Sequence, residues 1–198
     1  MSIFRRISLF FLVILAIIGL IAGILLASPA IIIPPVEPVQ PVTAYVVDVG
    51  LHARLVLPDE EGGLVQYAYG DWHYFALHQQ DWGSGIAALL IPTQGTLGRR
   101  KYQDIAEFKQ GIGNHITVLN FAVSGVQAKK LQKSLEQRFQ QNMNTQVFNP
   151  VNQMNFVKDD MEYTIYHNSN HELVVWLEDL DCRVEGFVLL ANFQVKSS

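Results

Sequence analysis

A continuous apolar run near the N-terminus constrains this chain more than any other feature. Residues 8–28 carry no ionisable side chain and include the stretch LFFLVILAIIGLIAGILL. A helix of about 20 apolar residues crosses the roughly 30 Å hydrocarbon core of a bilayer. Arg5 and Arg6 are the only charges before Glu37, and cationic flanks stay in the cytoplasm. The pattern predicts a cytoplasmic tip (residues 1–7), one transmembrane helix, and a domain on the non-cytoplasmic side.

A cleaved signal peptide is an alternative explanation of the same run. Signal peptides have shorter apolar regions of about 7–15 residues and a small-residue cleavage site. Pro29 and the isoleucines at 31–33 make a poor cleavage region, and no cysteine lies nearby for a lipoprotein anchor. A buried core helix is disfavoured because nothing polar interrupts the run. The anchor and the signal peptide both carry the domain out of the cytoplasm.

Prolines dominate the segment that follows. Residues 29–42 contain five of the eight prolines after position 28, a density that favours a stiff, extended spacer. Residues 43–198 are long enough for one domain with its own core. Without Arg5 and Arg6 the chain has 12 basic and 18 acidic residues, a net charge of −6. This balance, with no basic patch, argues against a nucleic-acid partner.

Cysteine usage bears on the compartment. Cys182 is the only cysteine, so no intrachain disulfide forms. Exported domains without disulfides are ordinary in bacteria, which predicts a single-pass protein of the bacterial inner (plasma) membrane with a periplasmic domain. The six histidines include His167-x-x-x-His171 but no metal-binding motif, and no glycine-rich phosphate loop is present. We therefore predict no metal and no other cofactor.

The domain alternates between strand-like and helix-like segments, which predicts an α+β fold. Strands are expected at residues 43–48, 52–57, 64–69, 115–123, 161–167 and 184–195. Helices are expected at 81–90, at 124–142, and from a start within 168–170, with weak helical character at 99–110. The Gly-Thr-Leu-Gly-Arg-Arg segment at 95–100 is interpreted as a solvated turn whose two cations are also able to meet an anionic headgroup.

The polar junction at Asn168, Ser169 and Asn170 is the main candidate site. It leads from a predicted strand into an amphipathic helix, where unsatisfied N–H groups and the helix dipole can activate a nucleophile and hold an oxyanion. His52, at the start of a strand, is the candidate base. Asp71 or His171 is the candidate group that orients it.

Each candidate also has a simpler explanation. Ser169 is a good helix cap, and Asn168 and Asn170 are good turn residues. Asp71 fits a turn, and His171 fits a solvent-facing position in the first turn of the helix. Tyr69 and Trp72 are candidates for lining a ligand pocket, as are Tyr74 and Trp82, although core packing is commoner for aromatic side chains. Cys182 is expected in the core.

Two stretches carry a resemblance to a known family. They are residues 49–58 (VGLHARLVLP) and Asn168-Ser169-Asn170-His171 with Trp176-Leu177 and Cys182 behind it, supported by residues 69–72 and 92–95. The chain resembles the bacterial domain of unknown function numbered 2459, also described as a conserved hypothetical protein of urease gene regions. That family in turn resembles circularly permuted papain-like folds of the lecithin:retinol acyltransferase type.

The resemblance implies an antiparallel sheet with packed helices, His52 as base and Ser169 at the position where those folds carry a cysteine. Serine is the weaker nucleophile and depends on a well-placed base. Two hypotheses follow. One is a hydrolase or acyltransferase acting on amide or ester bonds of lipids, lipoprotein acyl groups or cell-wall peptides. The other is an inactive tethered domain that uses the same cleft to bind a lipid, a peptide or a partner protein.

Overall fold

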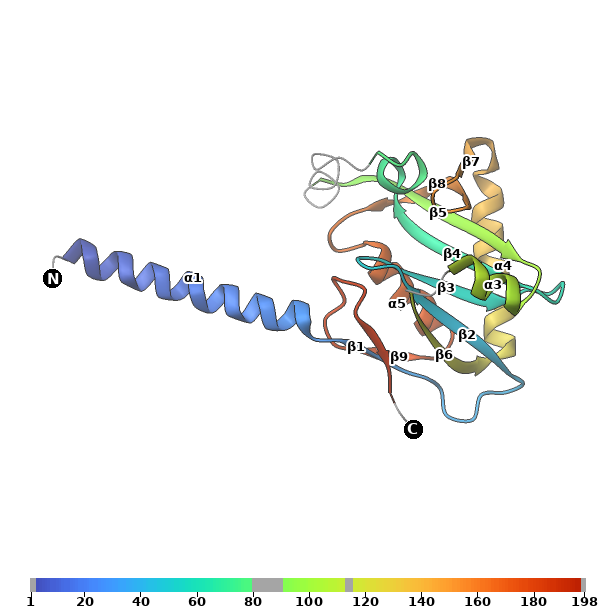
Figure 1. Cartoon of the computed structure of the whole chain (residues 1–198), viewed down its shortest axis with the longest axis horizontal. Coiled ribbons are helices and arrows are strands. Elements are labelled where there is room, and N and C mark those ends of the chain that lie inside the picture. The colour runs from blue at the N-terminus through green and yellow to red at the C-terminus, as the bar shows by residue number, and fades with distance from the viewer. Residues whose placement is uncertain (1–2, 80–90, 113–115, 197–198) are drawn as a thin grey trace.

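A large antiparallel sheet forms the centre of the computed structural model, which describes residues 3–79, 91–112 and 116–196 (Figure 1). Seven strands of the described chain follow the spatial order β6-β2-β3-β4-β5-β8-β7, and each neighbouring pair is antiparallel. These strands are β2 (Pro41–Asp48), β3 (Ala53–Pro58), β4 (Leu64–Asp71), β5 (Thr93–Tyr102), β6 (Thr117–Ser124), β7 (Val147–Asn149) and β8 (Met154–Tyr163). The predicted α+β class is confirmed.

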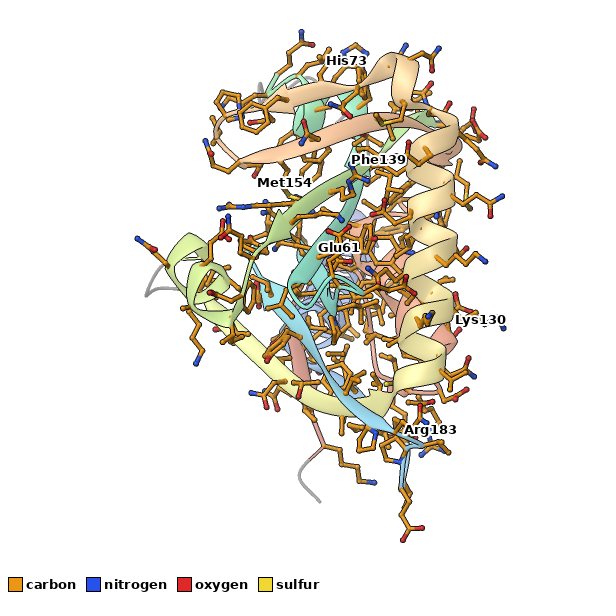
Figure 2. All side chains as sticks on the ribbon, turned by 90° about the vertical axis from the view of Figure 1, so that its right-hand side faces the viewer. Glu61, His73, Lys130, Phe139, Met154 and Arg183 are labelled. Carbon is orange, nitrogen blue, oxygen red and sulfur yellow. The ribbon has the colours of Figure 1, made fainter. Side chains whose placement is uncertain are left out.

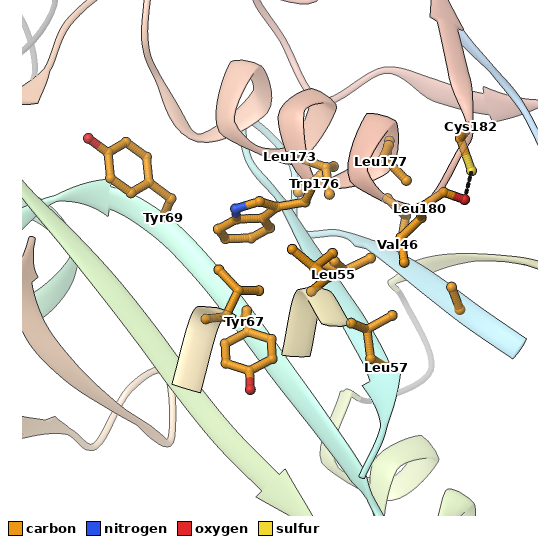
Figure 3. Close-up of a cluster of buried hydrophobic side chains, with 14 of the residues drawn as sticks. Val46, Leu55, Leu57, Tyr67, Tyr69, Leu173, Trp176, Leu177, Leu180 and Cys182 are labelled. Carbon is orange, nitrogen blue, oxygen red and sulfur yellow. Dashed lines mark hydrogen bonds between the residues drawn. The ribbon is translucent and has the colours of Figure 1, made fainter. Parts of the chain in front are cut away.

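Helices cover both faces of this sheet. Strand residues alternate between faces, and Leu55 of β3 packs with Leu173 and Trp176 of α5 (Ser169–Asp179) in the main core (Figure 3). The next residue, Val56, packs instead with Phe108 of α3 (Ile105–Ile112). We call these sides the α5 face and the α3 face.

The longest helix of the domain, α4 (Gly125–Gln141), also covers the α5 face. Figure 2 shows its Phe139 directed toward the sheet and Lys130 directed away from it. Two short helical turns, η1 (Trp72–Ala76) and η2 (Met143–Thr145), precede β5 and β7.

A second, three-stranded sheet corrects the predicted spacer. Strand β1 (Ala30–Ile33) lies between β9 (Arg183–Glu185) and β10 (Phe193–Val195). Ala30 and Ile32 are fully buried. Burial of the isoleucine run therefore pairs this segment into a sheet, where the sequence predicted a free spacer. The domain therefore begins near residue 30, and residues 29–42 are not wholly a spacer. The single strand predicted at 184–195 is two short strands instead.

The apolar N-terminal run lies within α1 (Ile3–Ala27), which projects away from the sheets (Figure 1). Over the described ranges, no helix combines the length and apolar character that crossing a membrane requires.

Other element boundaries also differ from prediction. Strand β5 runs through the segment predicted as a turn at 95–100, and α3 begins only at Ile105, so the helical tendency of 99–110 is half wrong. A side chain at Gly98 would meet the ring of Phe156, its partner on β8, which explains why glycine is placed inside a strand here. Strand β8 ends at Tyr163, ahead of most of the strand predicted at 161–167. The helix predicted at 81–90, with Trp82, lies outside the described residues.

Candidate active site

The structure brings the two main candidate residues into direct contact. The Nδ1 atom of His52 lies 2.8 Å from the Oγ atom of Ser169, although 117 positions separate them in the chain. His52 lies just before β3, and Ser169 is the first residue of α5. This distance is within the range of a nucleophile hydrogen-bonded to its base.

A neighbouring side chain caps the helix and leaves the Ser169 hydroxyl free for His52. The Oδ1 atom of Asn168 accepts hydrogen bonds from the backbone N–H groups of Asn170 (2.9 Å) and His171 (3.1 Å). Asn168 has extended backbone angles, as N-cap residues do. Capping, the simpler explanation for Ser169, therefore belongs to Asn168.

Asn170 fixes the helix start against the strand that carries the imidazole. Its Nδ2 donates to the carbonyl oxygens of Leu51 (3.0 Å) and Leu189 (3.2 Å), and its Oδ1 accepts from the N–H of Ala53 (3.1 Å). Leu51 and Ala53 are the residues on either side of His52. One buried amide thus sets the position of Ser169 relative to His52.

The surroundings of His52 keep its imidazole neutral. Its ring packs edge-on against Phe75 at 4.5 Å between centroids and against Tyr74 at 6.0 Å. Burial, reinforced by the positive charge of Arg54, lowers the pKa of His52 to about 4. An imidazole that is neutral at pH 7 can accept the hydroxyl proton.

Sequence reasoning missed Tyr163, the last residue of β8. It is 5% exposed, and its hydroxyl lies beside the Ser169 hydroxyl. Burial and the negative charge of Asp71 raise the pKa of Tyr163 to about 12, against the opposing effect of the Ser169 hydroxyl. Tyr163 therefore remains protonated and can donate a hydrogen bond beside the reacting oxygen. The only feature of the sequence that could have suggested a role for Tyr163 is its position six residues before Ser169.

Most of the backbone N–H groups predicted to hold an oxyanion already have hydrogen-bond acceptors. The N–H groups of Asn170 and His171 already bond the Asn168 side chain, and the N–H of Glu172 bonds the Asn168 carbonyl. The first N–H of a helix has no partner within the helix, which leaves that of Ser169. The Ser169 N–H and the Tyr163 hydroxyl are the groups best placed to stabilise an oxyanion.

Asp71 and His171, the two candidates for orienting His52, make other contacts. The Oδ1 of Asp71 accepts from the N–H of Tyr74 at 2.7 Å and so caps η1. Burial and then the charge of His167 lower the pKa of His171. Within the described parts of the chain, neither side chain hydrogen-bonds the His52 ring, and Phe75 and Tyr74 hold it by packing.

The predicted ligand-binding residues are largely structural. Asn168 and Asn170 are 3% and 1% exposed, and their side chains make the bonds described above. Trp72 packs with Phe75, Met154 and Phe156 in a small cluster on the α3 face of the sheet. The ring of Tyr69 is in the main core (Figure 3). Its hydroxyl donates to the carbonyl of Met161.

A buried ion cluster, also missed from the sequence, supports the start of α5. Arg138 of α4 binds Asp159 of β8 through Nε (2.6 Å) and Nη2 (2.9 Å), and it binds Glu172 of α5 through Nη1 (2.5 Å). Burial lowers the pKa of Arg138, but the two carboxylates outweigh it and the net shift is upward. Trp176 Nε1 also donates to Glu172, and His167 Nε2 lies 3.1 Å from that carboxylate. These contacts join three elements one helical turn from Ser169.

Cys182 is buried in the main core, as predicted, and burial raises its pKa to about 12. Of the residues that the structure describes, no three His, Cys, Asp or Glu side chains are grouped so as to hold a metal ion.

No family model, no curated protein and no solved structure matches this chain.

Proposed function

We propose that this chain is a serine-type hydrolase or acyltransferase that acts on an ester or amide carbonyl. The observation that carries the proposal is the 2.8 Å contact between Ser169 Oγ and His52 Nδ1, with the imidazole held neutral. A nucleophile, a base and a hydrogen-bond donor are the parts that acyl transfer needs. Ser169, His52 and Tyr163 supply them in this order.

In the first step, Ser169 Oγ attacks the carbonyl carbon while its proton passes to His52 Nδ1. The negative charge that develops on the carbonyl oxygen is stabilised by the Ser169 N–H and the Tyr163 hydroxyl. The imidazolium then protonates the leaving amine or alcohol, and an acyl-serine remains. Water, or an acceptor hydroxyl or amine, attacks this ester with His52 again as base, which regenerates Ser169.

The burial of Ser169 supports a second candidate, a binding domain without catalysis. Ser169 is 2% exposed, so a substrate reaches its hydroxyl only if neighbouring groups move. A Ser169–His52 hydrogen bond beside Tyr163 can also serve purely to hold α5 on the sheet. The chain would then use its surface to hold a lipid, a peptide or a partner protein.

Two further parts of the proposal rest on the sequence. One is membership of the bacterial family numbered 2459, with a permuted papain-like arrangement in which a helix start faces a strand histidine. The helix of α5 packed on β3 is compatible with that arrangement. The other is location at the inner membrane, anchored by residues 8–28, where lipids, lipoproteins and cell-wall peptides are the accessible substrates.

The test is active-site labelling of the full chain with a fluorophosphonate probe. We expect the wild type to be labelled at one residue and Ser169→Ala to lose the label. Ser124→Ala is the matched control, because Ser124 also precedes a helix and is 9% exposed. Labelling of Ser124→Ala should equal that of the wild type.

A thiol variant separates the two candidates. Ser169→Cys should react with iodoacetamide faster than a free thiol near pH 7, because the neutral His52 imidazole can accept the thiol proton as the sulfur attacks. Cys182, buried with its pKa near 12, contributes little background. If the wild type resists the fluorophosphonate and the Ser169→Cys thiol has ordinary reactivity, the enzyme proposal fails and the binding domain remains.

A further inference from the structure

A cavity of about 280 Å³ lies on the α3 face of the sheet, away from the Ser169 hydroxyl. Its walls include Val47, Ile112 and Ile116, and Val151 lies at its edge with 64% exposure. Its polar lining comes from Arg54, Gln66, Arg100 and Asn152.

The sheet register explains why the polar side chains converge. Arg54 pairs with Val47 across β3 and β2, and Gln66 pairs directly with Arg100 across β4 and β5. Arg54 and Val56 share a face, and Val56 is opposite Gln66. Two guanidinium groups and one amide therefore enter the same hollow from three adjacent strands.

Neither guanidinium group has a carboxylate partner. Over the described ranges, no ion pair includes Arg54 or Arg100. The Nη2 of Arg54 donates to a neutral acceptor, Oδ1 of Asn152, at 2.7 Å, and Arg100 lies over the Tyr102 ring at 4.6 Å. Burial lowers the pKa of Arg54, and the charge of Arg100 acts in the same direction. Cations partly withdrawn from water are normally paired, so this half-buried arrangement lacks a counter-charge among the described residues.

The amide of Gln66 adds an unsatisfied donor. Gln66 is 1% exposed, and its Oε1 accepts from the Tyr102 hydroxyl at 2.8 Å. Its Nε2 is buried without a hydrogen-bond partner among the described residues. Such an orphan donor costs free energy unless a ligand or water satisfies it.

We propose that this cavity binds a small organic anion, whose carboxylate or phosphate oxygens contact Arg54, Arg100 and the Gln66 amide. Guanidinium groups match the planar or tetrahedral arrangement of such oxygens. The valine and isoleucine walls contact the apolar body of the ligand. This site is distinct from the Ser169–His52 pair, because its lining does not include either residue, although the charge of Arg54 reaches His52.

The test measures binding of hexanoate and hexyl phosphate to the full chain by titration calorimetry, with hexanol as the uncharged control. We expect at least one anion to bind saturably, hexanol to bind at least tenfold more weakly, and added salt to weaken the anion. The tighter of the two anions identifies the headgroup.

Two variants locate the binding site. Asn152→Asp places a carboxylate beside Arg54 without removing any lining cation, and Arg54→Met removes one cation. Each should weaken anion binding by about tenfold or more, since a hydrogen bond to a charged group contributes about 1.5–3 kcal/mol. Arg183→Met is the matched control, because Arg183 is exposed and paired with Glu185; its affinity should equal that of the wild type.

The proposal is overturned if neither anion binds the wild type, or if hexanol binds as tightly as the anions. It is also overturned if Asn152→Asp and Arg54→Met, checked by circular dichroism for wild-type fold, retain the full affinity.

Discussion

Half-buried arginines have different partners on the two faces of the sheet. On the α5 face, Arg138 meets Asp159 and Glu172, and all three side chains have charge-assisted hydrogen bonds. On the α3 face, Arg54 and Arg100 share a cavity without any acidic residue among its lining groups. A charge withdrawn from water needs a partner. Arg138 has its partners within the chain, whereas Arg54 and Arg100 would obtain theirs from a bound anion.

The difference separates residues that hold the fold from residues that are available for binding. Arg138 joins α4, β8 and α5, so it positions the helix that begins with Ser169. Arg54 and Arg100 extend from strands that the backbone ladder already holds. Removing their side chains leaves the backbone hydrogen bonds of the sheet in place.

The largest expected effect comes from breaking the complete arrangement. Arg138→Met leaves the carboxylates of Asp159 and Glu172 buried without their cation, which costs about 3–5 kcal/mol in similar buried pairs. Arg54→Met removes an uncompensated cation and one hydrogen bond, so we expect a change within about 1 kcal/mol. Urea unfolding of both variants measures the difference in the free energy of unfolding.

An exposed pair supplies the baseline for that measurement. Arg183→Met breaks an ion pair with Glu185 in which both side chains are more than half exposed, and it should change stability by less than about 1 kcal/mol. If Arg54→Met costs as much as Arg138→Met, the contrast between the two faces is false.

The next effect is a pH dependence set by His52. Its pKa is lowered from 6.5 to about 4, by burial first and by Arg54 second. Between these values the unfolded chain binds a proton that the folded chain does not, so stability rises with pH. His52 thus disfavours folding by up to about 3 kcal/mol at pH 4 relative to pH 7. His52→Gln should flatten this part of the stability profile.

The imidazole titration tests the same shift directly. The nuclear magnetic resonance signal of the His52 ring should titrate near pH 4, and Arg54→Met should move its midpoint upward. A wild-type midpoint near 6.5 would contradict the neutral, desolvated base. It would also remove the influence of Arg54 on the candidate site.

Local patterns predicted the parts of this molecule that are set locally. The apolar stripe from Ala128 to Phe139 predicted α4, and runs of β-branched and apolar residues predicted the three central strands β2 to β4. The polar break at 168–170 predicted the start of α5. His52 and Ser169 were proposed from their positions at a strand entrance and a helix start, and the structure places them 2.8 Å apart.

Contacts between residues far apart in the chain could not be predicted from such local patterns. Nothing in the sequence marked Asp159 and Arg138 as partners, and only the packing of α4 on β8 brings them together. Glu172 resembled a helix-dipole residue but is 2% exposed. The segment containing Arg100 resembled a turn because its glycines favour loops, whereas they are needed where β5 packs closely on its neighbours. Sheet register, which the sequence does not state, determines all of these contacts.

The smallest effect tests whether capping and chemistry are divided between neighbouring residues. Asn168→Ala removes the acceptor for the Asn170 and His171 N–H groups, and loss of an N-cap costs about 1 kcal/mol. Asn168→Asp should retain that stability, because a carboxylate at a helix start is favoured by the dipole. Ser169→Ala should leave the cap intact and change unfolding by less than Asn168→Ala does. If Ser169→Ala is the more destabilising of the two, the Ser169 hydroxyl mainly stabilises the fold. Its contact with His52 would then no longer argue for a serine nucleophile.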